Sequence, residues 1–438
     1  MYSSHFNLKA YRMTSPATAK ILLPTLLTLV TIGALPVTDT PLNSRLLLNP
    51  SQLPKVEVIH EWVSLDYDWR FSWVKDYYTE RGWFDAKQNL LSSIDIYNGD
   101  IYVTVIRLSI AVPSGLNKVV TVQGKPVLQP FPSFGRNEIG ICSNLQFPFA
   151  SFTDPNTGYM YVVDVGRIGR NPNAQAPCPP KLVVLDLNNK GAILRSHSFP
   201  EVVVPRHTNM MNDLVLDYVT VNSTEVKYVY ITDTGNAQII VFDVQTNQTW
   251  AFRDVSMKTD ADRVFTINGV NYTMDVPVDG IAIDREYNFV YYSAVGSRKF
   301  YQIPTSVLRN NSGDFARDLR LVGNKVSNSD GMASGKTNIY YGAGGLNALF
   351  RWPITKDMET QGSTESNVTM ATQSLLAQDD NLFRWVDSMK LDTNGYLWFV
   401  SNRAPEYLNG NMDFTGAKGA NFRICRVFVD DLPYLLKS

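Results

Sequence analysis

The sequence EVKYVYITD, residues 225–233, is the most informative part of the chain about its fold, because similar sequences occur five more times. The other copies are YNGDIYVTV (97–105), NTGYMYVVD (156–164), EYNFVYYSA (286–294), KTNIYYGAG (336–344) and TNGYLWFVS (393–401). Each copy joins a turn to a short strand whose third residue is aromatic: Tyr102, Tyr161, Tyr230, Tyr291, Tyr340 or Trp398. Copies spaced by roughly 50 to 70 residues are typical of an array of small sheets. We therefore predict an all-β fold, a six-bladed β-propeller.

A shorter strand precedes each aromatic strand, and in five copies it ends in an acidic turn residue. These residues are Asp95, Asp154, Asp217, Asp284 and Asp392, and Gly335 takes the same place in the fifth copy. Five positions earlier in each copy lie Leu90, Phe149, Asn212, Asp279, Asp330 and Asp387. Because side chains alternate between the faces of a strand, the constant offset predicts one shared environment. We expect these six residues at one mouth of the central channel.

Three of the predicted channel residues are carboxylates. Acidic groups that converge repel one another, so that either one of them has a raised pKa or a cation lies among them. Such a channel selects positively charged ligands, and the rings of Phe149 and Trp385 would cover a protonated amine. In the structural alternative, the aspartates tie neighbouring blades together and the rings pack between blades.

Length, charge and the N-terminus bound the class of protein. The 438 residues carry a formal net charge of −1 and no basic run, which gives no reason to expect a nucleic-acid partner. Lys9, Arg12 and Lys20 precede an apolar run at 21–37 that meets small residues. This layout predicts a secretory signal peptide over residues 1–37, a single propeller domain over 38–438 and no membrane association after cleavage. An uncleaved membrane anchor is the alternative.

Two further features fit an extracellular protein. Five N-x-S/T sequons predict glycosylation at Asn222, Asn247, Asn271, Asn310 and Asn367. Cys142 and Cys178 bracket the second predicted blade, and an oxidising compartment would allow a disulfide between them. In the alternative, these two and Cys425 are small buried side chains.

Longer motifs follow one another in order along the predicted domain. They include VEVIHEWVSLDYDW (56–69), CPPKLVVLDL (178–187), YVYITDTGNAQIIVFD (228–243), YYSAVGSRKFYQIPTSVLR (291–309) and LWFVSNR (397–403). Together they resemble the yellow and major royal jelly protein family over almost the whole predicted mature chain. The resemblance implies a secreted propeller with a ligand pocket at one end of the channel. It also implies a role in dopachrome conversion, amine binding, or nutrition and signalling.

Motifs of known catalysts are largely missing. The sequence contains no H-E-x-x-H and no G-x-S-x-G. His207 is the one histidine near predicted channel residues, and we interpret it as a hydrogen-bonded loop residue, with a role as general base as the alternative.

Our first functional hypothesis, favoured by the resemblance, is a secreted protein that binds small aromatic amines or catechol-derived compounds, or converts them by a dopachrome-type proton shift. Asp279, Asp330 or Asp387 would meet the ammonium group, and Asn212 and Asn402 would hydrogen-bond the hydroxyls. Phe149 and Trp385 would flank the ring, and no cofactor is expected.

Two alternatives stay open. The first is a calcium-dependent lactonase or esterase, in which Asn212, Asp279 and Asp387 would be oxygen ligands. Leu90 counts against it, because such enzymes normally carry a glutamate on the first blade. The second alternative is a structural or nutritive secreted protein without a dedicated site.

Overall fold

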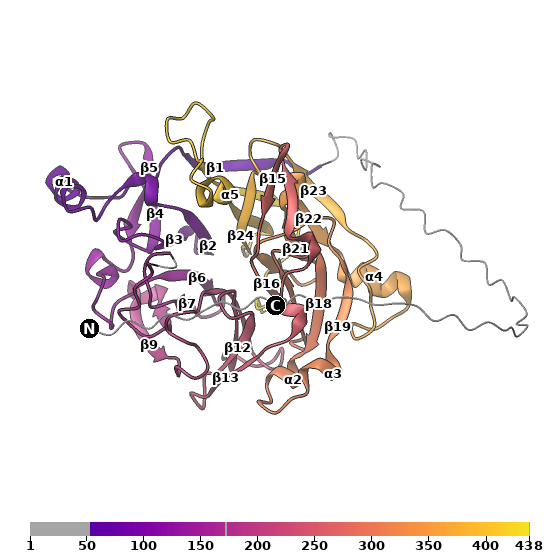
Figure 1. The fold of residues 1–438 in the computed structure, drawn as a ribbon. Coiled ribbons are helices and arrows are strands. Elements are labelled where there is room, and N and C mark those ends of the chain that lie inside the picture. Colours follow the sequence, from indigo (N-terminus) through magenta and orange to yellow (C-terminus); the bar gives the residue numbers. More distant parts are fainter. Residues whose placement is uncertain (1–52, 171–172, 438) are drawn as a thin grey trace, which may run out of the picture. The chain divides into compact units, whose positions relative to one another are not determined.

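The computed structural model describes residues 53–170 and 173–437, so the predicted signal peptide over 1–37 lies outside the described residues. The described residues form six four-stranded antiparallel sheets, which are arranged as a six-bladed β-propeller and confirm the predicted fold (Figure 1). The inner strands of successive blades lie next to one another and surround the central channel.

Five blades each use four consecutive strands. Blade 1 consists of β2 (Leu91–Tyr97), β3 (Asp100–Val105), β4 (Leu116–Val122) and β5 (Lys125–Pro130). Blade 2 consists of β6 (Pro148–Thr153), β7 (Tyr159–Asp164), β8 (Lys181–Asp186) and β9 (Ala192–Ser198). Blade 3 consists of β10 (Met211–Asp217), β11 (Tyr228–Asp233), β12 (Gln238–Asp243) and β13 (Thr249–Phe252). Blade 4 consists of β16 (Val278–Ile283), β17 (Phe289–Ala294), β18 (Lys299–Pro304) and β19 (Arg320–Asn324). Blade 5 consists of β20 (Met332–Ser334), β21 (Ile339–Ala343), β22 (Ala348–Trp352) and β23 (Ser374–Gln378).

Blade 6 joins the two ends of the described chain. It consists of β24 (Trp385–Leu391), β25 (Tyr396–Asn402), β26 (Phe422–Phe428) and β1 (Val56–Trp62). β1 runs antiparallel to β26, with Val56 opposite Val427 and Trp62 opposite Phe422. We predict this pairing from the sequence, because a closed ring removes exposed sheet edges, and the structure confirms it.

The remaining elements connect or cover the blades. A separate hairpin consists of β14 (Val264–Ile267) and β15 (Val270–Thr273). The helices are α1 (Ser72–Glu80), α2 (Thr305–Leu308), α3 (Phe315–Asp318), α4 (Ile354–Gln361) and α5 (Ala404–Leu408). Short 3-10 helices are η2 (Ala86–Gln88), η3 (Phe134–Asn137), η4 (Leu187–Asn189), η5 (Val255–Met257), η6 (Ala261–Arg263) and η7 (Gly344–Leu346). None of the helices within residues 53–170 and 173–437 is long and apolar enough to span a bilayer.

The six repeated aromatic residues occupy equivalent places on the second strand of each blade. All are buried: Tyr102, Tyr161, Tyr230, Tyr291, Tyr340 and Trp398. The Tyr230 hydroxyl donates to Asp217 at 2.6 Å, and the Trp398 indole N–H donates to Asp392 at 2.8 Å. In these two blades the turn aspartate supplies the partner that the polar edge of a buried aromatic side chain needs, whereas the Tyr291 hydroxyl donates to Glu365.

In blade 1 the predicted alignment is wrong by two residues. Tyr102 pairs with Asp95 inside β2, so that Asp95 is not a turn residue. A tight turn at residues 98–99, both with positive φ, joins β2 to β3, whereas the other blades use longer turns. The shorter turn shifts the equivalent positions, so that Ser92 and not Leu90 corresponds to the predicted channel residues.

Cys142 and Cys178 form a disulfide, with 5.2 Å between their Cα atoms, and this pairing is confirmed. Cys425 is a free, buried cysteine. The asparagines of all five sequons are exposed, and their glycosylation stays a prediction: Asn222, Asn247, Asn271, Asn310 and Asn367.

Candidate functional site

One side chain from each blade contributes to a ring across the channel, near the start of the inner strands. The ring members are Ser92, Phe149, Asn212, Asp279, Asp330 and Asp387. In five blades the pairing register of the inner strand shifts where the ring residue lies, which marks a β-bulge. A bulge changes the direction of a side chain, so the repeated bulge turns these residues toward the channel.

The Asp387 carboxylate of blade 6 is held by two side chains. Its Oδ1 accepts a hydrogen bond from the Ser92 hydroxyl at 3.0 Å, and its Oδ2 accepts one from the Asn402 amide at 2.6 Å. The Asn402 amide also donates to the Leu91 carbonyl at 2.8 Å. These contacts fasten blade 6 to blade 1, where the ring of blades closes.

Two other ring aspartates contact each other. The Asn212 amide donates to Asp279, and the Trp385 indole N–H donates to Asp330. The carboxyl groups of Asp279 and Asp330 are close neighbours, and the charge of Asp279 helps to raise the pKa of Asp330. Phe149 completes the ring from blade 2. All seven residues predicted for ligand binding therefore lie in one cluster, in which Asn212, Asp330 and Asp387 are half-buried.

Burial dominates the electrostatics of this ring. Desolvation raises the pKa of Asp279 to about 8 and raises those of Asp330 and Asp387 well above their ordinary range. Neighbouring carboxylates add to the upward shift in each case. Burial lowers the pKa of Lys325, beside Asp279 and Asp330, to about 7. The ring therefore keeps protons near neutral pH and carries less negative charge than its aspartates alone suggest.

The ring encloses little free space. Its cavity has a volume of about 10 Å³, which is roughly the space that one water molecule needs. An aromatic amine does not fit among these side chains in this arrangement. Within the described ranges, no group of three or more histidine, cysteine, aspartate or glutamate side chains is arranged to hold a metal ion. The calcium alternative on Asn212, Asp279 and Asp387 stays a prediction.

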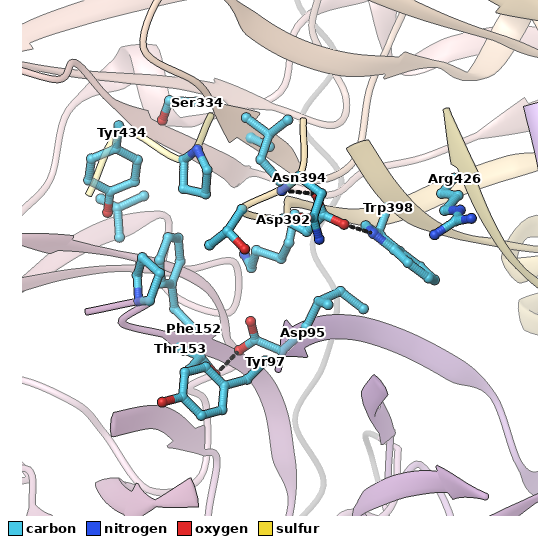
Figure 2. Close-up of a pocket in the computed structure, with 18 of the residues that line it drawn as sticks. Asp95, Tyr97, Phe152, Thr153, Ser334, Asp392, Asn394, Trp398, Arg426 and Tyr434 are labelled. Carbon is cyan, nitrogen blue, oxygen red and sulfur yellow. Dashed lines mark hydrogen bonds between the residues drawn. The ribbon is translucent and has the colours of Figure 1, made fainter. Parts of the chain in front are cut away.

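A larger cavity lies at the other end of the channel, where the inner strands turn into the second strands. We call this cavity the turn-side pocket. It has a volume of about 310 Å³, and every blade contributes to its wall. Figure 2 shows part of this wall, including Asp95, Tyr97, Phe152, Thr153, Asp392, Trp398, Arg426 and Tyr434. Its size and its aromatic lining suit a small aromatic molecule.

Asp95 and Lys390 are the least exposed of the charged residues that line this pocket, with 3% and 6% of their surface exposed. They hold equivalent places, because Asp95 pairs with Tyr102 in blade 1 and Lys390 pairs with Trp398 in blade 6. The Thr153 hydroxyl donates to Asp95 at 2.9 Å. Burial raises the pKa of Asp95 to about 6, against the opposing effect of the Lys390 charge.

Lys390 lies between the two cavities. Its ammonium nitrogen is 3.7 Å from Oδ1 of Asp213, a residue that lines the ring cavity. The same nitrogen lies 4.6 Å from the centre of the Phe152 ring, which lines the turn-side pocket. The ring and the turn-side pocket are therefore adjacent along the channel.

Asp95 and Lys390 are missing from the residues that the sequence predicts for the site. Asp95 is misassigned there as a turn residue, and Lys390 belongs to no motif. Their signal is a charge in an inner strand at a place that is apolar in other blades, such as Val215 and Ala282. His207 is exposed and lines neither cavity.

Comparisons with known proteins agree with this architecture. Residues 156–434 match the family model described as major royal jelly protein. Over 402 residues the chain is 26% identical to major royal jelly protein 1 of Apis mellifera, covering 86% of this chain and 88% of that protein. Over 405 residues it is 24% identical to dopaminechrome tautomerase of Drosophila melanogaster, covering 86% and 83%. Because the matched family model spans more than half of the sequence, the chain belongs to the major royal jelly protein family.

Proposed function

We propose that the protein binds a small catechol-derived aromatic compound in the turn-side pocket and moves a proton on its oxidised form. The observation that carries this proposal is the set of side chains that line the turn-side pocket. The pocket of about 310 Å³ combines aromatic walls with the buried carboxyl group of Asp95 and the buried ammonium group of Lys390. The relative named dopaminechrome tautomerase supports the choice of ligand class.

The proposed reaction needs a general base and a positively charged group in the protein, and both must contact the same ligand. In the proton shift of an aminochrome, a base removes a proton from ring carbon, the electron pair moves through the ring, and a quinone oxygen gains a proton. Asp95 suits the base, because a carboxyl with a pKa of about 6 is mostly ionised at pH 7 yet still holds a proton well. The Lys390 ammonium would stabilise the charge that develops on oxygen. The step is an isomerisation and needs no oxidant or reductant.

The ring residues would act behind this pocket. Asp213 contacts Lys390 and so fixes the position of its ammonium group. The first hypothesis from the sequence instead places the ligand amine on Asp279, Asp330 or Asp387, which in this structure requires ring side chains to move. The two locations differ in which aspartate the ligand contacts, and variants distinguish them.

We also propose that the protein is secreted. The disulfide between Cys142 and Cys178 supports this localisation, because such bonds persist in oxidising compartments. The exposure of all five sequon asparagines is compatible with glycosylation on the same route.

Asp95→Asn is the direct test of the pocket. The variant keeps the shape of the side chain and removes its charge, so we expect dopamine and serotonin to bind roughly ten- to hundred-fold more weakly. Calorimetric titration of the purified protein measures this, and loss of aminochrome absorbance measures turnover. Turnover should fall at least as much as binding, because a base is lost as well.

Asp387→Asn is the matched control in the ring, since it makes the same chemical change in the other cavity. We expect its amine affinity to stay within about two-fold of the wild type. The opposite pattern, with affinity lost in Asp387→Asn and kept in Asp95→Asn, would move the ligand into the ring. Binding of calcium and not of amines, abolished by a chelator, would favour the lactonase alternative.

A further inference from the structure

The C-terminal segment, Asp430–Lys437, crosses the turn-side mouth of the channel. Pro433 forms a β-bridge with Gly335 of blade 5, and the Asn156 amide of blade 2 donates to the Leu435 carbonyl at 2.8 Å. The segment therefore spans from one side of the channel to the other.

Asp431 anchors the start of this segment in a place that the repeat leaves open. Blade 5 has Gly335 where the other longer turns begin with an aspartate. The Asp431 carboxylate fills that place and accepts hydrogen bonds from the Tyr340 hydroxyl and the Lys336 N–H, both at 3.0 Å. A Cβ atom at Gly335 would lie 2.2 Å from Asp431 Oδ2, so only glycine leaves room for this carboxylate. The C-terminal segment thus supplies the turn carboxylate that blade 5 lacks.

Tyr434 is the residue of the segment that reaches the channel. It is 4% exposed. Its hydroxyl accepts from the Leu216 N–H and donates to the Leu216 carbonyl, both at 2.9 Å. Its ring lies 5.8 Å from that of Phe152 in blade 2 and 6.2 Å from that of Tyr287 in blade 4. One side chain from the tail therefore contacts three blades.

We propose that Tyr434 determines ligand specificity. The C-terminal segment that carries Tyr434 forms a removable wall of the turn-side pocket, and this wall limits the size of the ligand. Pro433 and Tyr434 line this pocket together with strand residues from all six blades. The strands are fixed by their sheets, whereas the segment is held by Asp431, by the Leu216 contacts and by backbone bonds at its two ends. The wall accepts a compact one- or two-ring cation and excludes a cation with a long substituent. This inference rests on the pocket of the proposed function.

The first experiment measures selection by size. Dopamine and N-octyldopamine share the catechol and the ammonium group but differ in length, and their affinities are compared by calorimetry. In Tyr434→Ala the preference for dopamine should fall at least about tenfold, the range expected when a buried contact is removed. Tyr434→Phe keeps the ring but loses the Leu216 bonds, and should lose part of the preference. Asp430→Asn is the control, because Asp430 is exposed and its positive φ suits asparagine; its preference should match the wild type.

A second experiment needs no ligand. Ser334 lines the pocket, and in the described residues the native cysteines are paired or buried, so Ser334→Cys offers one reactive thiol. We divide its labelling rate with a small methanethiosulfonate by its labelling rate with a bulky maleimide. This ratio falls as the opening of the pocket becomes larger. Adding Tyr434→Ala or Asp431→Asn should lower that ratio at least about tenfold.

The outcomes separate the two proposals. If the wild type binds neither amine but the labelling ratio falls in the variants as expected, the proposed function is wrong, and the inference that the C-terminal segment limits ligand size is supported. If Tyr434→Ala lowers the melting temperature while the affinity preference and the labelling ratio stay unchanged, the segment has only a structural role, and the inference that it limits ligand size is wrong.

Discussion

A chain truncated after Phe422 is expected to yield no folded, secreted protein, whereas a chain truncated after Val429 is expected to fold. The first truncation removes nearly all of β26, which lies between β25 and β1 in blade 6. β1 then has no partner, the ring of blades opens, and two strand edges are exposed to aggregation. The second truncation removes the C-terminal segment only, so the closing pairs from Val56 opposite Val427 to Trp62 opposite Phe422 remain.

Secretion from a eukaryotic host, followed by circular dichroism and thermal unfolding, checks this pair of truncations. The shorter chain should be retained or aggregated. The longer one should be secreted with a β-rich spectrum and a lower melting temperature, because it lacks the buried Tyr434 and Leu435. A cooperative unfolding transition from the shorter chain would contradict closure by β1 and β26.

Asp279→Asn is expected to be more stable than the wild type at pH 7 and equally stable near pH 4. Burial raises the pKa of the folded-state carboxyl to about 8 from an ordinary value of 3.8. Below pH 4 both states hold the proton. As pH rises above 4, the unfolded chain releases this proton first, so the free energy of unfolding falls. Asparagine cannot ionise and escapes this loss.

The effect of Asp279 on the free energy of unfolding can be measured apart from that of Lys325 in the range from about pH 4 to about pH 7. Above it Lys325 acts in the opposite direction, because its pKa is lowered to about 7 and the unfolded chain then holds the proton longer. Thermal unfolding at pH 4, 5.5 and 7 should show a gain for Asp279→Asn that grows with pH and reaches about 3 °C or more. Asp430→Asn, at an exposed position, should follow the wild type throughout. A lower melting temperature for Asp279→Asn at every pH would show instead that an ionised aspartate ties two blades together.

The number of blades, and the strand of each blade that carries the buried aromatic residue, could be predicted from the sequence alone. Both follow from contacts between neighbours in sequence, because a turn aspartate and the aromatic residue beyond it, such as Asp217 and Tyr230, lie in one hairpin. The ring residues of blades 2 to 6 also follow from the sequence, because they lie at a constant distance from the turn, and in four of these blades the same bulge recurs there.

The register of blade 1, the volumes of the two cavities and the place of the C-terminal segment could be learned only from the folded structure. The turn at residues 98–99 is tight enough to move Asp95 into the channel, and an alignment on acidic residues does not detect this. Cavity volumes depend on how side chains from all six blades pack, so the sequence could not indicate that the ring is filled while the turn-side pocket is open. Asp431 fills the place above Gly335 from far along the chain. Local patterns specify hairpins, whereas contacts between distant segments arise only when the closed ring brings those segments together.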